Sequence, residues 1–358
     1  MDPNIHLLCV SPSSSIRQAI ACIDRNEKGI VLITDEKQRL LGAITDGDVR
    51  RALLAGLNLD VPVSELLARK AGSIYPKPIT APVGTNPTDL LQLMKKHVIR
   101  QVPLLDREGR VVGLATMDEL LPEKTPPFQA VIMAGGYGTR LRPLTRKLPK
   151  PMLPVGRQPM LELIIKQLRK AGIRNVNIST HYKAKKITEH FGDGSAFGVQ
   201  LQYLREDRPL GTAGALGLMR KSKEPILVIN GDILTKVNFR AMLDFHREQK
   251  ADMTVAVQKY DVQVSYGVVE TENCFIRRLT EKPNFLYLVN AGIYLLEPSV
   301  PHLIPKGEHF DMTDLIQKLL DQGRPVVSFP IREYWLDIGN HAEYNQAQGD
   351  IKKGRLKT

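Results

Sequence analysis

The apolar and polar positions of this chain alternate between strand-type and helix-type patterns. Short apolar runs of strand type occur in the second part of the chain, at 130–133, 175–180, 225–229, 253–258 and 290–295. Helix-type periodicity lies between them, over 160–171 and 239–249. This alternation predicts an α/β fold, a three-layer Rossmann-like domain with a mostly parallel sheet. Ligands of such domains bind at the carboxyl ends of the strands.

The first 121 residues contain an internal repeat. Five positions recur at an offset of 71 residues, with Val31, Asp35, Arg39, Gly42 and Thr45 matched by Val102, Asp106, Arg110, Gly113 and Thr116. Each copy predicts a strand, a polar turn, a second strand, and a helix that begins near Asp46 or Met117. One such unit cannot bury its sheet face alone, so we expect the two copies to pack as a pseudo-symmetric pair.

A proline-rich segment, 122–127, separates the two halves and predicts a stiff linker. We therefore expect a repeat-containing module over 1–121 and a larger domain over 128–358. The three cysteines lack a CxxC pair, and the N-terminus lacks the pattern of a signal peptide, so we expect a cytoplasmic protein with reduced thiols. No apolar run reaches membrane-spanning length, so we expect no membrane partner.

The net charge of +12 is unevenly distributed. Residues 1–127 carry 16 basic and 15 acidic side chains, whereas residues 128–358 carry 34 and 23. A nucleic-acid ligand is one interpretation, but no aromatic-basic strip or known module supports it. Attraction of small polyanionic substrates explains the same bias.

A glycine-rich loop follows the apolar run 130–133. Its glycines, Gly135, Gly136 and Gly138, allow backbone N–H groups to turn toward an anion. Thr139 and Arg140 follow, and Arg140 supplies a bidentate donor. Together with the mobile charge of Lys150, the loop suits a triphosphate.

Two commoner glycine loops are excluded by the residues that follow Gly138. Walker A requires Gly-Lys-Ser/Thr, and here Thr139 and Arg140 stand in those places. The dinucleotide fingerprint requires a third glycine where this chain has Leu141. A glycine-rich β-turn without a ligand is the alternative.

Two further groups of residues point to a nucleotide and a metal. Gly211 and Gly214, which flank Thr212, allow close approach of the backbone to a flat base. Asp232 follows the strand-type run 225–229, where a carboxylate is well placed to hold Mg²⁺. A turn residue that caps the next helix is the alternative for Asp232.

The run from 130 to 154 resembles the signature of the sugar-1-phosphate nucleotidyltransferases. The resemblance implies that Arg140 and Lys150 are catalytic, and that Asp337 is the second ligand of the metal held by Asp232. It also implies that Glu206 faces the base edge. A carboxylate accepts from the two adjacent donors of guanine, so Glu206 favours GTP, whereas a solvated charge cluster over 205–208 is the alternative.

The same resemblance assigns the sugar-phosphate half of the site. It implies that Gly267 approaches the sugar, Glu281 accepts from its hydroxyls, Lys282 contacts its phosphate and Asn290 contacts the ring. A strand-end turn is the alternative for the Glu-Lys-Pro segment. Asp311 fits a helix cap, and an acid there could also pair with the ammonium group of an amino sugar.

The repeat in the first half resembles tandem CBS domains, whose ribose-phosphate motif is Gly-x-x-Thr/Ser-x-x-Asp. Thr45 and Asp48 meet this motif in the first copy, and the second copy departs from it because Glu119 follows Thr116 at the acidic position. The resemblance implies an adenine nucleotide as ligand, and a regulatory or dimerising role that makes a homo-oligomer. A helix cap with first-turn acids is the alternative for Thr45 and Asp48.

These observations predict transfer of a nucleotidyl group from an NTP to a sugar 1-phosphate, with release of pyrophosphate. The combination of modules resembles the glucosamine-1-phosphate guanylyltransferases of legionaminic acid synthesis, with mannose 1-phosphate and GTP as the closest alternative. A non-catalytic nucleotide sensor is a second class of function, and it predicts the loss of a metal Asp or of a basic residue. All five charged residues that the resemblance assigns to the phosphates and the metal are present, namely Arg140, Lys150, Asp232, Lys282 and Asp337.

Overall fold

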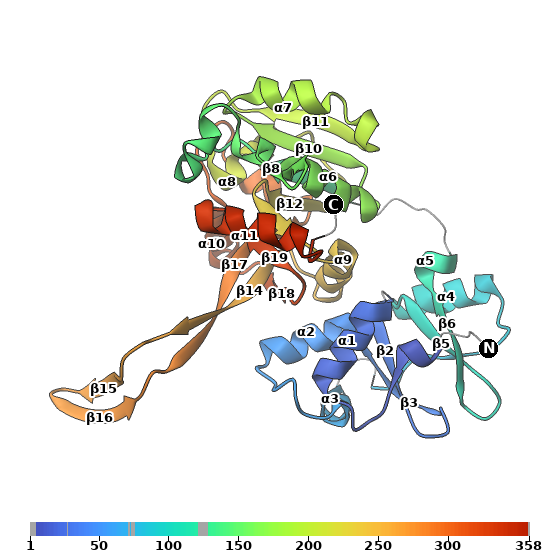
Figure 1. Cartoon of the computed structure of the whole chain (residues 1–358). Coiled ribbons are helices and arrows are strands. Elements are labelled where there is room, and N and C mark those ends of the chain that lie inside the picture. The colour runs from blue at the N-terminus through green and yellow to red at the C-terminus, as the bar shows by residue number, and fades with distance from the viewer. Residues whose placement is uncertain (1–4, 27, 71, 73–75, 121–127, 357–358) are drawn as a thin grey trace. The chain divides into compact units, whose positions relative to one another are not determined.

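The computed structural model describes residues 5–26, 28–70, 72, 76–120 and 128–356 of the chain. The chain forms two compact units, Met1–Lys124 and Thr125–Thr358. Figure 1 shows both units. The predicted linker 122–127 lies outside the described residues, so the boundaries of the two predicted domains stay a prediction.

The first unit contains two three-stranded sheets with the same arrangement. One sheet consists of β1 (Cys9–Val10), β2 (Ile30–Thr34) and β3 (Leu40–Thr45), and the other of β4 (Ala81–Pro82), β5 (Gln101–Leu105) and β6 (Val111–Thr116). The helical elements of this unit are η1 (Ile5–Leu8), α1 (Ile16–Asn26), α2 (Asp46–Leu54), α3 (Val63–Lys70), α4 (Pro87–His97) and α5 (Met117–Leu120). Strand, turn, strand and helix follow one another in both copies, as the repeat predicts.

The polar turns of the two copies hold the sheets together. Leu40 N donates to Gly109 O, and Val111 N donates to Gln38 O, at 3.1 and 3.0 Å. Val111 is also buried in a cluster with Leu32 of the first copy. These reciprocal contacts confirm that the two copies form a pseudo-symmetric pair.

A seven-stranded sheet forms the centre of the second unit, in the order β11-β10-β7-β12-β17-β14-β18. Its strands are β7 (Gln129–Met133), β10 (Asn175–Thr180), β11 (Gln200–Arg205), β12 (Ile226–Asn230), β14 (Met253–Gln263), β17 (Asn284–Leu296) and β18 (Val326–Pro330). Within this sheet β17 runs antiparallel to both of its neighbours, and the other pairings are parallel. The predicted mostly parallel sheet is confirmed.

Buried side chains of β7 alternate between the two faces of this sheet. Ala130 and Ile132 belong to one core cluster, and Val131 belongs to another. The first cluster includes residues of α6 (Met160–Lys170), α7 (Ala184–Phe191) and α9 (Phe239–Glu248), and the second includes residues of α8 (Gly211–Gly214) and α10 (Met312–Asp321). Helices therefore cover both faces, which confirms the three-layer fold.

Shorter elements surround this sheet. Three two-stranded pairs are formed by β8 (Pro154–Val155) with β9 (Gln158–Pro159), β13 (Ile233–Thr235) with β19 (Trp335–Asp337), and β15 (Val268–Glu272) with β16 (Phe275–Thr280). The remaining helices are η2 (Thr139–Leu141), η3 (Leu144–Arg146), η4 (Lys150–Met152), η5 (Ser195–Phe197), η6 (Ala215–Leu218), η7 (Val300–Leu303) and α11 (His341–Lys352). Among the described residues, no helix combines the length and apolarity needed to cross a membrane.

Two strands extend well beyond the sheet. The apolar pattern predicts strands over 253–258 and 290–295, but β14 continues to Gln263 and β17 begins at Asn284. Their outer parts are exposed, so no core imposes a continuous apolar run there. With β15 and β16 they form a projecting ribbon, residues 258–289, that points away from the body of its unit in Figure 1.

Stability of the second unit is expected to fall as the pH drops below the usual histidine pKa of 6.5. His246 is buried between Thr254 Oγ1, at 2.8 Å, and Glu297 Oε1, at 3.1 Å. Burial lowers the pKa of His246, although Glu297 acts in the opposite direction. Below pH 6.5 His246 therefore binds a proton in the unfolded chain but stays neutral in the folded chain. The contribution of neutral, buried His246 to the free energy of unfolding is lost as the pH falls toward the pKa that His246 has in the folded protein.

Urea unfolding at pH about 7.5 and about 5.5 measures this effect, with a ceiling of about 1.4 kcal/mol per pH unit for one proton. His246→Gln is the matched control, since it keeps polar contacts and does not titrate. An equal pH dependence of wild type and variant would contradict the prediction.

Candidate functional site

The glycine-rich loop lies at the carboxyl end of β7, as predicted. Gly138 has a positive φ of 62°. A Cβ atom there would lie 2.9 Å from Lys150 Cβ and from Thr145 Cγ2. Thr145 Oγ1 also donates to Gly138 O at 2.8 Å. The loop is therefore packed directly against the segment that carries Lys150, and glycine is required at position 138.

Two aspartates that are far apart in the sequence lie close together at the neighbouring strand end. Asp232 follows β12, and the short strands β13 and β19 pair Ile233 with Asp337. Ile338 N also donates to Asp232 O at 3.0 Å. Lys150 Nζ forms an ion pair with the Asp232 carboxylate. The structure thus brings Asp232, Asp337 and Lys150 together, all three from separate segments.

The Asp337 carboxyl group lies in an unusual environment. Burial raises its pKa to about 6, and the negative charge of Asp232 acts in the same direction. The positive charges of Lys150 and Arg140 act to lower the pKa of Asp337, so Arg140 also contributes to the electrostatic field at this carboxyl group. Arg140 itself is exposed on the loop that follows β7. These groups form one electrostatic cluster.

The cluster fits a divalent cation. Asp337 Oδ1 is buried and has no hydrogen-bond partner among the described residues, and the same holds for Asn230 Oδ1. A cation between two carboxylates would supply the missing partner and remove their mutual repulsion. In the described part of the chain no group of three His, Cys, Asp or Glu side chains could hold a metal. Two carboxylates with substrate oxygens and water are, however, the usual ligands of Mg²⁺.

A cavity of about 390 Å³ opens beside this cluster. Its described lining comes from β12 and β17 of the central sheet, from the β13–β19 pair, and from the first residues of α8 and α10, and it includes Thr212, Asn230, Asn290, Asp311, Trp335 and Asp337. Trp335 Nε1 donates to Ala291 O at 2.9 Å, which fixes the indole ring at the cavity wall. The volume is that of a small-molecule site.

Asp311 and Thr212 both line the cavity and are hydrogen-bonded to each other. Thr212 donates to Asp311 Oδ1 from its N–H at 2.8 Å and from its Oγ1 at 3.1 Å. Asp311 immediately precedes α10, and its N–H donates to the Asp314 carboxylate at 2.9 Å. The predicted helix cap is thus observed, and it also lines the cavity.

Glu206 lies beneath the glycine-rich loop rather than in a solvated cluster. Its side chain is buried, while Arg205, Asp207 and Arg208 are exposed. Its carboxylate accepts from Ser179 Oγ and from Leu210 N. The described contacts of Glu206 hold its own loop in place, and its contact with a base stays a prediction.

Glu206→Ala is expected to destabilise the protein by about 1–3 kcal/mol, because it leaves two buried donors without an acceptor. Those donors are Ser179 Oγ and Leu210 N. Denaturant unfolding measures the loss, and Glu206→Gln, which keeps an acceptor oxygen, is expected to lose less. Equal stability of wild type and Glu206→Ala would refute the structural role.

The predicted sugar-phosphate residues are divided between two places. Asn290 lines the cavity, and its Oδ1 accepts from Gly292 N at 3.0 Å. Gly267, Glu281 and Lys282 lie on the projecting ribbon, and none of them lines the cavity. A Cβ atom at Gly267 would lie 3.0 Å from Glu281 Oε2, so these two are neighbours. Their contacts with a sugar stay predictions.

The predicted ligand residues of the first unit are engaged within the protein. Thr45 precedes α2 and forms a capping box with Asp48. The buried Asp48 carboxylate also accepts from Lys70 Nζ at 2.6 Å and pairs with Arg51. Burial acts to raise the pKa of Asp48, but Lys70, the Thr45 N–H and Arg51 together act more strongly in the opposite direction, so the pKa is lowered. The alternative interpretation as helix-cap residues is therefore observed, and a nucleotide contact stays a prediction.

The second copy repeats this arrangement in a weaker form. Glu119 Oε2 accepts from Thr116 N at 3.3 Å, and the Glu119 carboxylate pairs with Lys28. The cation that pairs with Glu119 of the second copy thus comes from the first copy. In contrast, Asp48 and its partner Lys70, which follows α2, both belong to the first copy. The two predicted ligand positions are not equivalent.

Sequence reasoning missed Asn230 as a residue of the site. Its carbonyl oxygen is orphaned in the cavity wall, and a Cβ atom at Gly292 would lie 2.7 Å from its Nδ2. Gly292 has a positive φ of 69°, so it leaves room for the amide. The sequence feature that could have identified Asn230 is its position at a strand end, directly before Gly231 and Asp232.

Comparison with known proteins agrees with this geometry. Residues 129–354 match the nucleotidyl transferase family, and residues 1–55 and 71–124 match the CBS domain. A mannose-1-phosphate guanylyltransferase of Mycobacterium tuberculosis is 33% identical, over 64% of this chain and 66% of its own length. A UTP–glucose-1-phosphate uridylyltransferase of Synechocystis sp. is 34% identical, over 64% and 65%. The chain thus spans just under two thirds of the length of these relatives.

A solved structure assigned as a glucose-1-phosphate thymidylyltransferase from Bacillus anthracis is also similar. It is 28% identical and has a TM-score of 0.50, with 62% of this chain and 94% of that chain covered. The structure of HddC from Yersinia pseudotuberculosis, with 24% identity and a TM-score of 0.50, shares the fold over 62% of this chain and 99% of its own.

Proposed function

This chain belongs to the nucleotidyl transferase family and carries a CBS domain pair, and from this premise we propose that it is a sugar-1-phosphate nucleotidyltransferase. It transfers a nucleotidyl group from an NTP to a hexose 1-phosphate and releases pyrophosphate. The observation that carries this proposal is the cluster of Lys150, Asp232 and Asp337 beside the glycine-rich loop, within reach of the charge of Arg140.

In the proposed reaction a sugar-phosphate oxygen attacks the α-phosphorus of the NTP. A bond forms between these two atoms, and the bond from the α-phosphorus to the bridging oxygen breaks as pyrophosphate leaves. The nucleophile is already an anion, so the protein needs no general base. Its work is to orient the reactants and to neutralise their charge.

Charge neutralisation is demanding because both reactants are anions. Unit charges about 4 Å apart repel by about 1 kcal/mol in water, and by several times more in a drier site. The backbone N–H groups of the loop and the side chains of Arg140 and Lys150 would bind the phosphates and reduce this repulsion. Asp232 and Asp337 would hold a divalent cation, Mg²⁺ in our proposal, which supplies further charge neutralisation when bound.

For the substrates we propose GTP and glucosamine 1-phosphate, with mannose 1-phosphate as the alternative sugar. Guanine is supported by the guanylyltransferases among the relatives, while the uridylyltransferase at similar identity is the competing indication. The amino sugar is supported by the Asp311 carboxylate in the cavity wall, which suits an ammonium group. An adenine nucleotide at the CBS pair would add regulation.

Incubation of the full chain with each of four NTPs and a panel of hexose 1-phosphates tests the proposal. We expect pyrophosphate release with GTP and an amino sugar 1-phosphate or mannose 1-phosphate. A strong preference for UTP or dTTP would contradict the choice of base. Release with no pair would contradict the enzymatic proposal and leave a nucleotide sensor as the better one.

A further inference from the structure

The first turn of α11 contacts both charged segments of the candidate site. One segment carries Arg140 in η2, and the other carries Asp337 at the end of β19. The neighbours of these two residues in the chain share one buried apolar cluster with α11, and this cluster includes Leu141, Leu336, Ile338 and Ala347. The helix and both charged segments therefore belong to one core.

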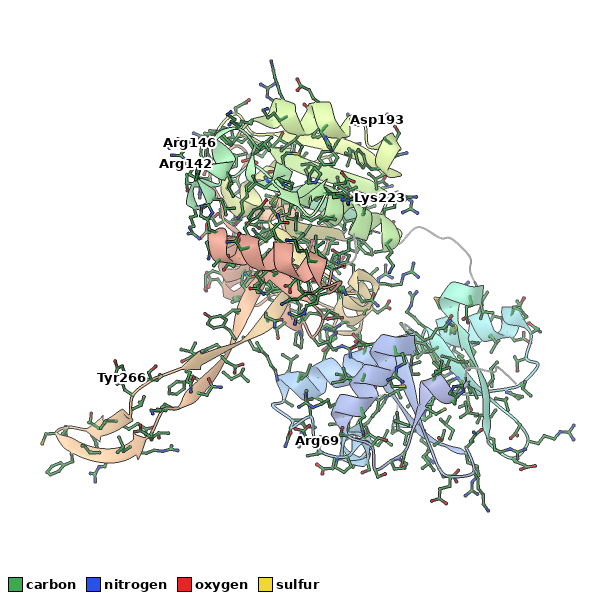
Figure 2. The ribbon with its side chains drawn as sticks, viewed as in Figure 1. Arg69, Arg142, Arg146, Asp193, Lys223 and Tyr266 are labelled. Atoms are coloured by element: carbon green, nitrogen blue, oxygen red, sulfur yellow. The ribbon has the colours of Figure 1, made fainter. Side chains whose placement is uncertain are left out.

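His341, the first residue of α11, holds the segment that carries Arg140. Its Nε2 lies 2.9 Å from the carbonyl oxygen of Arg142, a residue that Figure 2 shows at the edge of the second unit. Because a carbonyl oxygen only accepts, His341 Nε2 carries the hydrogen and donates. On the other side of Arg140, Gly138 O accepts from Thr145 Oγ1 at 2.8 Å. Both ends of the short turn around Arg140 are thus held by side chains, one of them from α11.

Glu343, two residues farther along α11, holds the segment that carries Asp337. Its Oε2 accepts from Gly339 N at 2.6 Å and from Asn340 N at 3.0 Å. A Cβ atom at Gly339 would lie 3.1 Å from this oxygen and 3.9 Å from Asp337 Oδ1, so Glu343 closely approaches the segment of the metal ligand. Asn340 Oδ1 accepts from Glu343 N at 3.1 Å and completes the capping box of α11. The start of the helix therefore fixes the backbone directly after Asp337.

Small displacements of these two segments are expected to change turnover. Arg140 is exposed, and a guanidinium group binds phosphate through two parallel donors only when it is correctly oriented. A displacement of about 1 Å in a group that orients a substrate can lower the rate about 100-fold. Contacts that orient a metal ligand likewise change metal affinity or activity by about 10- to 100-fold. A residue that touches no substrate can therefore contribute to turnover through the segment that it holds.

We propose that the first turn of α11 is a positioning element, which sets Arg140 relative to the metal site through His341 and Glu343. The inference rests on the proposed function, which assigns phosphates to Arg140 and a divalent cation to Asp232 and Asp337. Neither His341 nor Glu343 is among the described residues that line the cavity, so both act through the segments that they hold. A purely structural role of α11 predicts instead a loss of stability with unchanged kcat and metal affinity.

A double-mutant cycle on pyrophosphate release tests His341. His341→Ala is expected to lower kcat about 10-fold, since the loss of one contact shifts Arg140 by less than the distance of about 1 Å that costs about 100-fold. His341→Gln, whose amide can donate to Arg142 O, is expected to recover most of this loss. In an Arg140→Ala background, His341→Ala is expected to cost nothing further. Equal fold losses in both backgrounds, or an unchanged kcat of His341→Ala, would overturn the inference. His302→Ala, at another exposed histidine of the second unit, is expected to keep wild-type kcat.

Binding of Mn²⁺ without substrates, followed by electron paramagnetic resonance, tests Glu343 independently of activity. Glu343→Ala is expected to weaken Mn²⁺ binding about 10-fold. Glu343→Gln keeps an acceptor oxygen for Gly339 N and is expected to lose less. Asn340→Ala is the matched control, because it weakens the same capping box and leaves the bond from Gly339 N to Glu343 in place. An effect of Glu343→Gln equal to that of Glu343→Ala would assign the loss to charge, and an equal effect of Asn340→Ala would assign it to helix stability. Either result, or an unchanged affinity of Glu343→Ala, would overturn the inference.

Amide hydrogen exchange separates this inference from the proposed function. The N–H groups of Leu141 and Arg142 close the turn around Arg140 by hydrogen bonds within it. Their exchange is expected to be faster in His341→Ala than in wild type or His341→Gln. This result in a protein that releases no pyrophosphate from any substrate pair would support the positioning and contradict the proposed function. Unchanged exchange in an active protein would contradict the positioning alone.

Discussion

Asp232→Asn is expected to lower kcat by at least about 100-fold with the fold intact. The substitution keeps an oxygen that can accept from Lys150, so the local contact with this lysine survives. It removes the negative charge that, with Asp337, makes the pair suitable for a divalent cation. The loss is therefore expected in turnover and in metal binding, and not in stability.

Initial rates of pyrophosphate release measure turnover, and titration with Mn²⁺ followed by electron paramagnetic resonance measures metal binding. Asp321→Asn, at the exposed end of α10, makes the same change of charge away from the cavity and serves as the control. Wild-type turnover, or an unchanged affinity for Mn²⁺, would remove Asp232 from the proposed role.

Arg140→Ala is expected to lower kcat by about 1,000-fold, the lower part of the range for an arginine that stabilises phosphoryl transfer. Arg140 is exposed on the loop, and its charge reaches Asp337. Arg140→Lys restores the charge but not the planar pair of donors, so we expect only partial recovery.

The separation of kcat from KM identifies what Arg140 does. A change in KM alone would mean that it binds substrate and transition state equally, contrary to the prediction. Arg220→Ala, at another exposed position of the same unit, is expected to retain wild-type kinetics. Near-ultraviolet circular dichroism checks that each variant keeps its tertiary structure.

The local parts of the fold and the site could be predicted from the sequence. Strand β10 has the predicted bounds, and α6 and α9 each end one residue earlier than predicted. The glycine-rich loop after β7 and the position of Asp232 after β12 could also be predicted from the sequence, because each depends on residues that are adjacent in the chain. The repeat predicted two similar sheets in the first unit, because each copy of the repeat is itself a continuous stretch of the chain.

Contacts between residues far apart in the sequence were harder to predict. Asp232 and Asp337 meet because the three-residue strands β13 and β19 pair, and strands so short carry no pattern of their own. Only the family resemblance suggested that the two residues act together. The inward orientation of Glu206 depends on Ser179 and Leu210, which the sequence does not mark as its partners.

The projecting ribbon was also beyond a reading of apolar runs. Tyr260 and Val262 alternate with the polar Lys259 and Asp261, a pattern typical of a strand with one covered face. Nothing within the chain covers that face over the described residues, so a sequence pattern that predicts burial is found on an exposed surface.

The close packing at Gly138 restricts how the glycine-rich loop can be altered. A Cβ atom at position 138 would lie 2.9 Å from Lys150 Cβ and from Thr145 Cγ2. A side chain at 138 therefore has no room unless residues 145 and 150 are replaced by smaller ones or move. Mutant libraries that randomise the loop alone should return glycine at 138 almost without exception. Libraries that vary 138, 145 and 150 jointly are the better starting point for directed evolution toward other triphosphates.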